Sequence, residues 1–184
     1  MHHGNRFMRE YPAIKDVFEK LYFKRQADKW YIDTCKRQLS LPEDLYSLEH
    51  IVEIKAQHQV SPSNYFYIKL PDVKGEGGFC LSQEIQLIIS KIVPVYTYDL
   101  VYLMKHDSLK SDLDMSGSSS TLEMIETETS IRSIMEKAGY LLLNHEYDLY
   151  DTVYEWSELE RIDPVNRRLI LKDAAFVDIL ELCP

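Results

Sequence analysis

One stretch of the sequence matches a metal-binding pattern from end to end: DLDMSGSSSTLE, residues 112–123. An EF-hand calcium loop places oxygen ligands at its positions 1, 3, 5 and 12 and a glycine, here Gly117, at position 6. The main-chain carbonyl of Ser118 would be a further ligand. The side chains at the four ligand positions are those of Asp112, Asp114, Ser116 and Glu123. This pattern predicts a calcium-responsive module.

The surroundings of this stretch favour another interpretation, a mobile Ser-rich loop at about 107–121. Consecutive serines lower the stiffness of the chain, and the preceding HDSLKS does not present the apolar face of a flanking helix. Ser119 stands where a calcium loop carries an apolar residue. Ser120 and Glu123 match a capping box, which accounts for the glutamate without a metal. Because a motif outside its helix-loop-helix context is a weak signal, we favour the loop.

The second candidate is the acidic and aromatic stretch HEYDLYDTVYEWSELE, residues 145–160. Aromatic rings offer large contact areas at low entropic cost, and carboxylates around them can pair with Arg and Lys. The residues predicted to contact a basic partner are Glu146, Tyr147, Asp148, Tyr150, Asp151, Tyr154, Glu155 and Glu158. The alternative, which charge runs more often adopt, is an amphipathic helix with Leu149, Val153 and Trp156 toward the core and solvated carboxylates.

Negative charge is concentrated in the same part of the chain. The protein carries a net charge of -9, and residues 107–160 contain 3 Lys and Arg against 13 Asp and Glu, a net charge of -10. Such a block repels phosphate backbones and attracts basic surfaces. Nucleic-acid binding is therefore not expected, since it requires clustered Lys and Arg. A basic protein is the expected partner.

Residues that could form a catalytic site are few. Cys80 follows a glycine-rich turn and could act as a nucleophile with His106 or His145 as the base, which would make the protein a hydrolase-like enzyme. Such a cysteine is more often an ordinary strand residue after a hairpin turn. Neither the other cysteines, Cys35 and Cys183, nor the KGEGG turn provides the spacing of a metal or nucleotide site. We expect no cofactor and favour a non-catalytic protein.

Apolar residues recur at helical spacing in six segments. Helices are predicted from Pro12 to about Tyr22, over 27–39, from Ser40 to about Gln57, from Ser82 to the residue before Pro94, from Ser120 to Ala138, and from Asp173 to Cys183. The segment after Ser40 also has a capping-box pattern. Gly139 is expected to terminate its helix in a left-handed conformation.

The strand signals are shorter. A hairpin is predicted where DVKGEGG joins residues 65–71 to FCL, and further strands at 140–143 and 167–172. Residues 95–104 fit a strand best but also suit a helix. Together with the helices, these segments predict a helix-rich α+β fold, a single domain over 1–184 with a small antiparallel sheet.

The longest apolar run, residues 87–104, is broken by Lys91, Pro94 and Asp99, so we do not expect it to cross a membrane. The first residues show no secretory signal, and a cytoplasmic location is expected. The preferred hypothesis is a non-catalytic, acidic protein-binding module that engages a basic partner. A bacterial immunity protein that neutralises a toxin is its concrete form.

Overall fold

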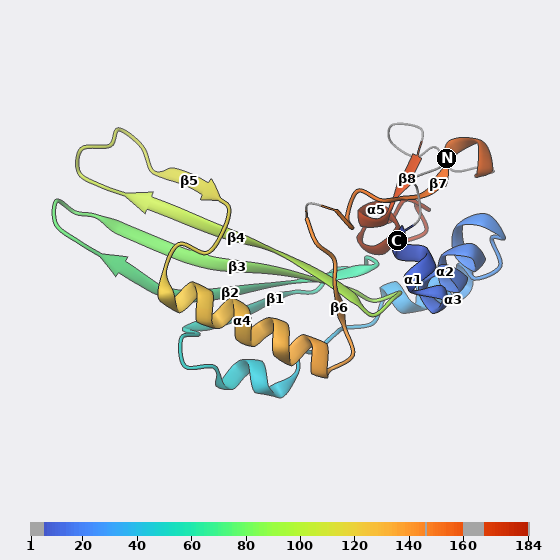
Figure 1. Ribbon diagram of the computed structural model, residues 1–184, viewed down its shortest axis with the longest axis horizontal. Coiled ribbons are helices and arrows are strands. Elements are labelled where there is room, and N and C mark those ends of the chain that lie inside the picture. The colour runs from blue at the N-terminus through green and yellow to red at the C-terminus, as the bar shows by residue number, and fades with distance from the viewer. Residues whose placement is uncertain (1–5, 146, 160–167, 184) are drawn as a thin grey trace.

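A long sheet forms the body of the computed structural model, which describes residues 6–145, 147–159 and 168–183 (Figure 1). The strand order is β1-β2-β3-β4-β5, with every neighbouring pair antiparallel, and β6 pairs with β4 in parallel. The strands are β1 (Glu53–Gln57), β2 (Ser63–Lys74), β3 (Cys80–Ser90), β4 (Val95–Lys105), β5 (Leu113–Ser116) and β6 (Leu141–Leu142).

The helices lie in two places (Figure 1). Helix α4 (Leu122–Lys137) and the 3-10 turn η2 (Glu43–Ser47) lie alongside the sheet. At one end of the sheet are α1 (Arg6–Glu10), α2 (Pro12–Phe18), the π-helical turn η1 (Glu19–Phe23), α3 (Asp28–Cys35) and α5 (Leu171–Phe176). The same end carries a two-stranded sheet of β7 (Thr152–Glu155) and β8 (Arg168–Ile170), and the 3-10 turn η3 (Trp156–Glu158) follows β7.

The prediction of a helix-rich fold with a small sheet is wrong. Strand makes up 31% of the structure against 32% helix, and the main sheet has six strands, whereas the helices are short. The error comes from two segments that were predicted as helices, at 82–93 and at 40–57. In both, apolar spacing alone did not distinguish a helix from an extended chain.

Residues 82–93 belong mainly to strand β3, the centre of the sheet. Gln83, Ile85, Leu87 and Ile89 are buried in strict alternation, the period of a strand. The spacing of the isoleucines fits a helix as well, but β-branched side chains favour the extended chain. Here β3 also pairs along its length with both β2 and β4, which no local pattern reveals.

Residues 40–57 form only the short turn η2 before the chain extends into strand β1. Pro42 precedes the turn, and no side chain caps it, so the predicted capping box does not form. Leu45 is nevertheless fully buried against the sheet. The β1 residues pair with β2 as an edge strand, which supplies hydrogen bonds that a helix would have made internally.

Several predicted elements are confirmed with adjusted ends. The helices at 12–22 and within 27–39, the hairpin between β2 and β3, and the strand at 95–104 are present. Helix α4 begins after Thr121, not Ser120, and the Thr121 hydroxyl accepts from the N–H of Met124 at 3.2 Å. Gly139 has the expected positive φ of 85°. None of the described helices has the length and apolar character needed to span a membrane.

The last helix and the strand before it are shorter than predicted. Strand β8 covers only Arg168–Ile170, and helix α5 begins at Leu171, so Asp173 lies in its first turn and does not cap it. The first residue of the strand predicted at 167–172 lies outside the described residues.

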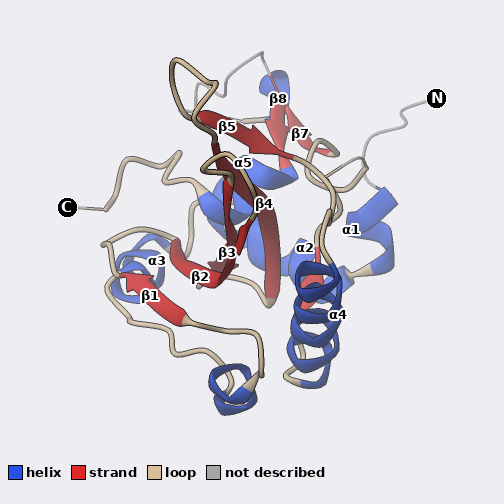
Figure 2. Cartoon of the chain, turned by 90° about the vertical axis from the view of Figure 1, so that its left-hand side faces the viewer, coloured by secondary structure: helices blue, strands red, loops and turns tan. Residues whose placement is uncertain are grey.

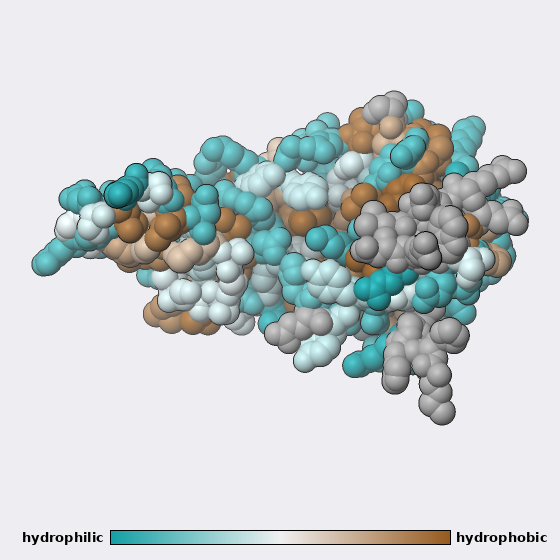
Figure 3. Space-filling model, turned by 90° about the horizontal axis from the view of Figure 1, so that it is seen from above, coloured by the Kyte–Doolittle hydropathy of each residue, from teal (hydrophilic) through white to brown (hydrophobic). Residues whose placement is uncertain are grey.

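Two hydrophobic clusters stabilise the chain. One lies between α4, η2 and the buried face of the sheet, and the other joins the terminal helices, β7, β8 and the near end of the sheet. Viewed along the strands, α4 lies beside one face of the sheet (Figure 2). The surface seen from above is largely hydrophilic, with apolar side chains over the two ends of the molecule (Figure 3). On β5 the exposed apolar residues are Leu113 and Met115.

Hydroxyl groups connect helix α5 to the rest of the fold. The last carbonyls of a helix have no partner within it and must be satisfied from outside. Three buried side chains donate to them, Tyr22 to Ala174 O at 2.6 Å, Ser90 to Ala175 O at 2.7 Å and Ser63 to Phe176 O at 2.9 Å. These donors come from η1, β3 and β2, so the end of α5 holds the helical end of the molecule against the sheet.

Candidate functional site

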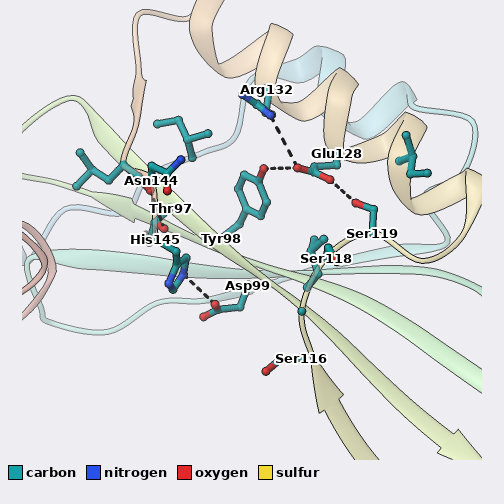
Figure 4. Close-up of a pocket in the computed structure, with 15 residues that line it drawn as sticks. Thr97, Tyr98, Asp99, Ser116, Ser118, Ser119, Glu128, Arg132, Asn144 and His145 are labelled. Atoms are coloured by element: carbon teal, nitrogen blue, oxygen red, sulfur yellow. Dashed lines mark hydrogen bonds and ion pairs between the residues drawn. The ribbon is translucent and has the colours of Figure 1, made fainter. Parts of the chain in front are cut away.

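A cavity of about 780 Å³ opens along the outer edge of strand β4 (Figure 4). Its walls are residues 97–100 of β4, residues 116–119 at the end of β5 and just after it, one side of helix α4, and residues 142–145 around the end of β6. The cavity lies along a part of the sheet edge with which no strand of the described residues pairs. On this edge, β6 pairs only with Val95 and Tyr96, and β5 pairs only with residues 101–104.

Glu128 of helix α4 is the centre of one polar cluster in the cavity. Its carboxylate accepts a hydrogen bond from the hydroxyl of Tyr98 at 2.5 Å and another from the hydroxyl of Ser119. The guanidinium of Arg132, one helical turn away, lies 4.0 Å from the same carboxylate. Burial raises the pKa of Tyr98, and the hydrogen bond to Glu128 raises it further, so the phenol remains a protonated donor at neutral pH.

A second pair, Asp99 and His145, lies on the other side of strand β4 (Figure 4). Successive side chains of a strand point to opposite faces, so Tyr98 faces α4 and Asp99 faces away from it. The imidazole Nε2 of His145 lies 2.9 Å from the Asp99 carboxylate, and both side chains are nearly half-exposed. Within the described residues, no serine or cysteine side chain hydrogen-bonds to His145. The cavity therefore presents carboxylates, hydroxyls and a guanidinium as hydrogen-bonding groups.

The acidic and aromatic stretch does not form the amphipathic helix considered above. It runs through turns into strand β7, although Leu149 and Val153 are buried as that interpretation required. Tyr147 and Tyr150 are 67% and 50% exposed. Tyr154 is half-buried, its ring stacks on that of Phe23 at 6.0 Å between centroids, and burial raises its pKa to about 12.

Three carboxylates of this stretch hold main-chain N–H groups. Asp148 accepts from Asn144 at 3.0 Å, Asp151 from Phe7 at 3.4 Å and Glu158 from Glu155 at 2.7 Å. These hydrogen bonds orient the carboxylates at the surface. Glu146, also predicted to contact a partner, lies outside the described residues.

The four calcium candidates lie on strand β5, on the residue before it and at the start of helix α4. Asp112 forms an ion pair with Lys105 at 3.0 Å, Asp114 and Ser116 lie on strand β5, and Glu123 lies in the first turn of α4. Within the described ranges, no group of three or more His, Cys, Asp or Glu is arranged to hold a metal ion. Part of the predicted Ser-rich loop is thus strand β5, and the serines at 118–120 connect it to α4.

Cys80 and His145, one of the two bases considered with it, do not form one site. Cys80 lies opposite Lys105 at the far end of β3, whereas Asp99, the partner of His145, lies opposite Gln86. Six residues of strand separate the two positions, about 20 Å. The Nδ1 of His106 is 2.6 Å from the hydroxyl of Ser108, and its ring lies over Gly77.

The thiols should differ in reactivity. Burial raises the pKa of Cys35, and burial together with a hydrogen bond to Cys35 raises the pKa of Cys183. Both thiols therefore stay protonated to a higher pH than an ordinary cysteine. We expect 5,5′-dithiobis(2-nitrobenzoic acid) at pH 8 to label one thiol of the folded protein quickly, Cys80, and all three in denaturant. The variant Cys80→Ser should lose the fast phase. A fast phase that survives this substitution would contradict the assignment.

Sequence reasoning missed most of the residues that line the cavity. Glu128 and Arg132 are four residues apart on a helix, a spacing common on any solvated helix face. Tyr98 fits the alternation of an ordinary strand. Only the tertiary contact between β4 and α4 distinguishes these residues from those of any other helix face or strand. Comparison with protein-family models, curated proteins and solved structures gives no match to this chain.

Proposed function

We propose that this protein is a non-catalytic, acidic protein-binding module that engages a basic protein partner. A toxin-neutralising bacterial immunity protein, acting in the cytoplasm, is the concrete class that we favour. The observation that carries the proposal is the exposure of Tyr147 and Tyr150 beside carboxylates that main-chain N–H groups hold in place. Exposed aromatic rings next to oriented charges are typical of energetically important contact residues.

The charge distribution supports the same proposal. The segment 107–160, with a net charge of -10, provides every wall of the cavity except β4 itself. The acidic groups of this segment would attract a basic surface over long range. Tyr147 follows His145, a residue that lines the cavity, by two positions. The exposed tyrosines and the cavity would thus belong to one contact region.

The first test compares matched tyrosine variants. A partner is captured from lysate on the immobilised protein, eluted with a salt gradient, identified, and titrated by calorimetry as a purified protein. We expect Tyr147→Ala with Tyr150→Ala to weaken binding about tenfold or more, since exposed contact tyrosines are frequent hot spots. Tyr46→Ala is the control, because Tyr46 is 58% exposed on another part of the chain.

A charge test completes the design. Glu155→Lys should weaken binding and reduce its dependence on salt, whereas Glu76→Lys, an exposed position on the β2–β3 hairpin, should not. The proposal predicts a basic partner that elutes only at raised salt. If nothing binds specifically, or if the double tyrosine variant binds as tightly as the natural protein, the proposal is wrong.

A further inference from the structure

On the outer edge of strand β4, the main-chain groups of one residue, Tyr98, face no strand among the described residues. Leu143 donates its N–H to the carbonyl of Tyr96 at 2.8 Å, and Gly117 donates its N–H to the carbonyl of Leu100 at 3.2 Å. Both donors approach β4 from the side that β5 and β6 occupy. Alternate residues of a strand direct their main-chain groups to the same side. The carbonyl of Tyr98, midway between these two, therefore points to this edge as well.

The N–H group of Tyr98 points in the same direction. In an antiparallel strand, the N–H and C=O of one residue face the same neighbour, and Tyr98 lies opposite Leu87 of β3 at a position where those groups turn outward. Within the described part of the chain, no strand pairs with residues 97–99 on this edge. Tyr98 thus offers one main-chain donor and one acceptor to the cavity.

The side chains around this position carry charge on both faces of the sheet. Glu128 lies on the α4 face and Asp99 on the opposite face. A chain that paired with Tyr98 would direct alternate side chains to these two faces. The cations already present are Arg132, 4.0 Å from Glu128, and His145, which pairs with Asp99 and is charged only when protonated. The surrounding segment, with its net charge of -10, favours an incoming cation.

We propose that the cavity receives an extended segment of the basic partner, which pairs with the main chain of Tyr98 and places an Arg or Lys side chain against Asp99 or Glu128. The inference rests on the proposed function, because it names how that partner is held. Adding a strand to a vacant sheet edge is a general mode of peptide recognition. The open stretch, residues 97–99, is about 10 Å long and accommodates about three residues of an extended chain.

The test uses the full-length protein and a defined probe, the acetylated and amidated pentapeptide threonine-arginine-valine-arginine-threonine. One control peptide carries glutamine in place of both arginines, and a second carries an N-methyl group on the central valine, which blocks main-chain pairing. Binding is followed in ¹H–¹⁵N spectra and by amide hydrogen exchange. We expect the parent peptide to shift and protect the Tyr98 amide, and each control peptide to bind about tenfold more weakly.

Substitutions identify the charged contacts. Asp99→Asn and Glu128→Gln keep the shape of the side chains. At least one of these substitutions should weaken the binding of the peptide about tenfold. Asp33→Asn, at an exposed acidic position on α3, should leave binding unchanged. Spectra of each variant establish that it is folded.

The outcomes separate this inference from the proposed function. The edge-pairing inference is wrong if the peptide does not bind at about 1 mM. It is also wrong if the N-methylated peptide binds as tightly as the parent peptide and the Tyr98 amide stays unprotected. A captured basic partner that still depends on Tyr147 and Tyr150 would leave the proposed function standing in that case. Failure to capture any basic partner, with the peptide bound as expected, would overturn the proposed function and would support only the pairing of an extended basic chain with Tyr98.

Discussion

Replacing Leu87 with alanine lowers the free energy of unfolding by about 2–5 kcal/mol, the range for deleting a buried leucine side chain. Leu87 is fully buried in β3 and lies between Phe66 of β2 and Tyr98 of β4 in the sheet register. Its removal leaves a cavity in the central strand, where both neighbouring strands restrict relaxation. Urea unfolding followed by circular dichroism measures the change.

This prediction also distinguishes the strand from the helix that periodicity suggested. On a helix, Ile85, Ile88 and Ile89 would share the buried face and Leu87 would lie on the opposite side. Leu87→Ala would then change stability little. Gln86→Ala is the control, because the Gln86 side chain faces the other side of the sheet. Its free energy of unfolding should stay within about 0.5 kcal/mol of that of the natural protein. A loss below about 1 kcal/mol for Leu87→Ala contradicts the strand assignment.

Replacing Ser90 with alanine destabilises the protein by at least about 2 kcal/mol, although it removes a single oxygen atom. The Ser90 hydroxyl is buried, donates to the carbonyl of Ala175 at 2.7 Å and accepts from the N–H groups of Ile92 and Val93, each at 3.3 Å. The substitution leaves three main-chain groups without this partner. Each buried polar group left unpaired costs about 1–3 kcal/mol.

Thermal and urea unfolding measure the effect, and Ser82→Ala is its control. Ser82 lies on the same strand and donates to Asp72 at the surface, where water replaces the lost partner, so its substitution should cost less than about 0.5 kcal/mol. Ser63→Ala, which removes one hydrogen bond to α5, should fall between the two. Equal stability of Ser90→Ala and Ser82→Ala would show that the hydroxyls do not hold α5 to the sheet.

Some features of the fold are predictable because they are local. Helix α4 combines an apolar stripe with a cap at each end, and the β2–β3 hairpin combines two β-favouring runs with a glycine turn. The residue that caps α4 is Thr121 and not the predicted Ser120, because neighbouring hydroxyl residues offer nearly equivalent caps. The concentration of negative charge in 107–160 can be read directly from the order of the residues.

Local sequence patterns predict the candidate site less well than these elements. Tyr147 and Tyr150 are exposed, as a contact surface requires, and that surface remains a prediction. The calcium pattern spans strand β5 and the start of α4, because a strand partner on β4 determines the conformation of residues 113–116. A match of residue types at the right spacing carries no information about such a partner.

By itself, the sequence determined the amphipathic helix α4, the hairpin and the concentration of negative charge in 107–160, since each depends on residues close together in the chain. The tertiary structure alone decided that the isoleucine-rich segment is a strand and that a cavity opens beside Tyr98. An isoleucine pattern satisfies helical and extended periods alike, and pairing with β2 and β4 selects between them. The cavity joins Tyr98 to Glu128, 30 residues away, and Asp99 to His145, contacts that only the folded chain creates.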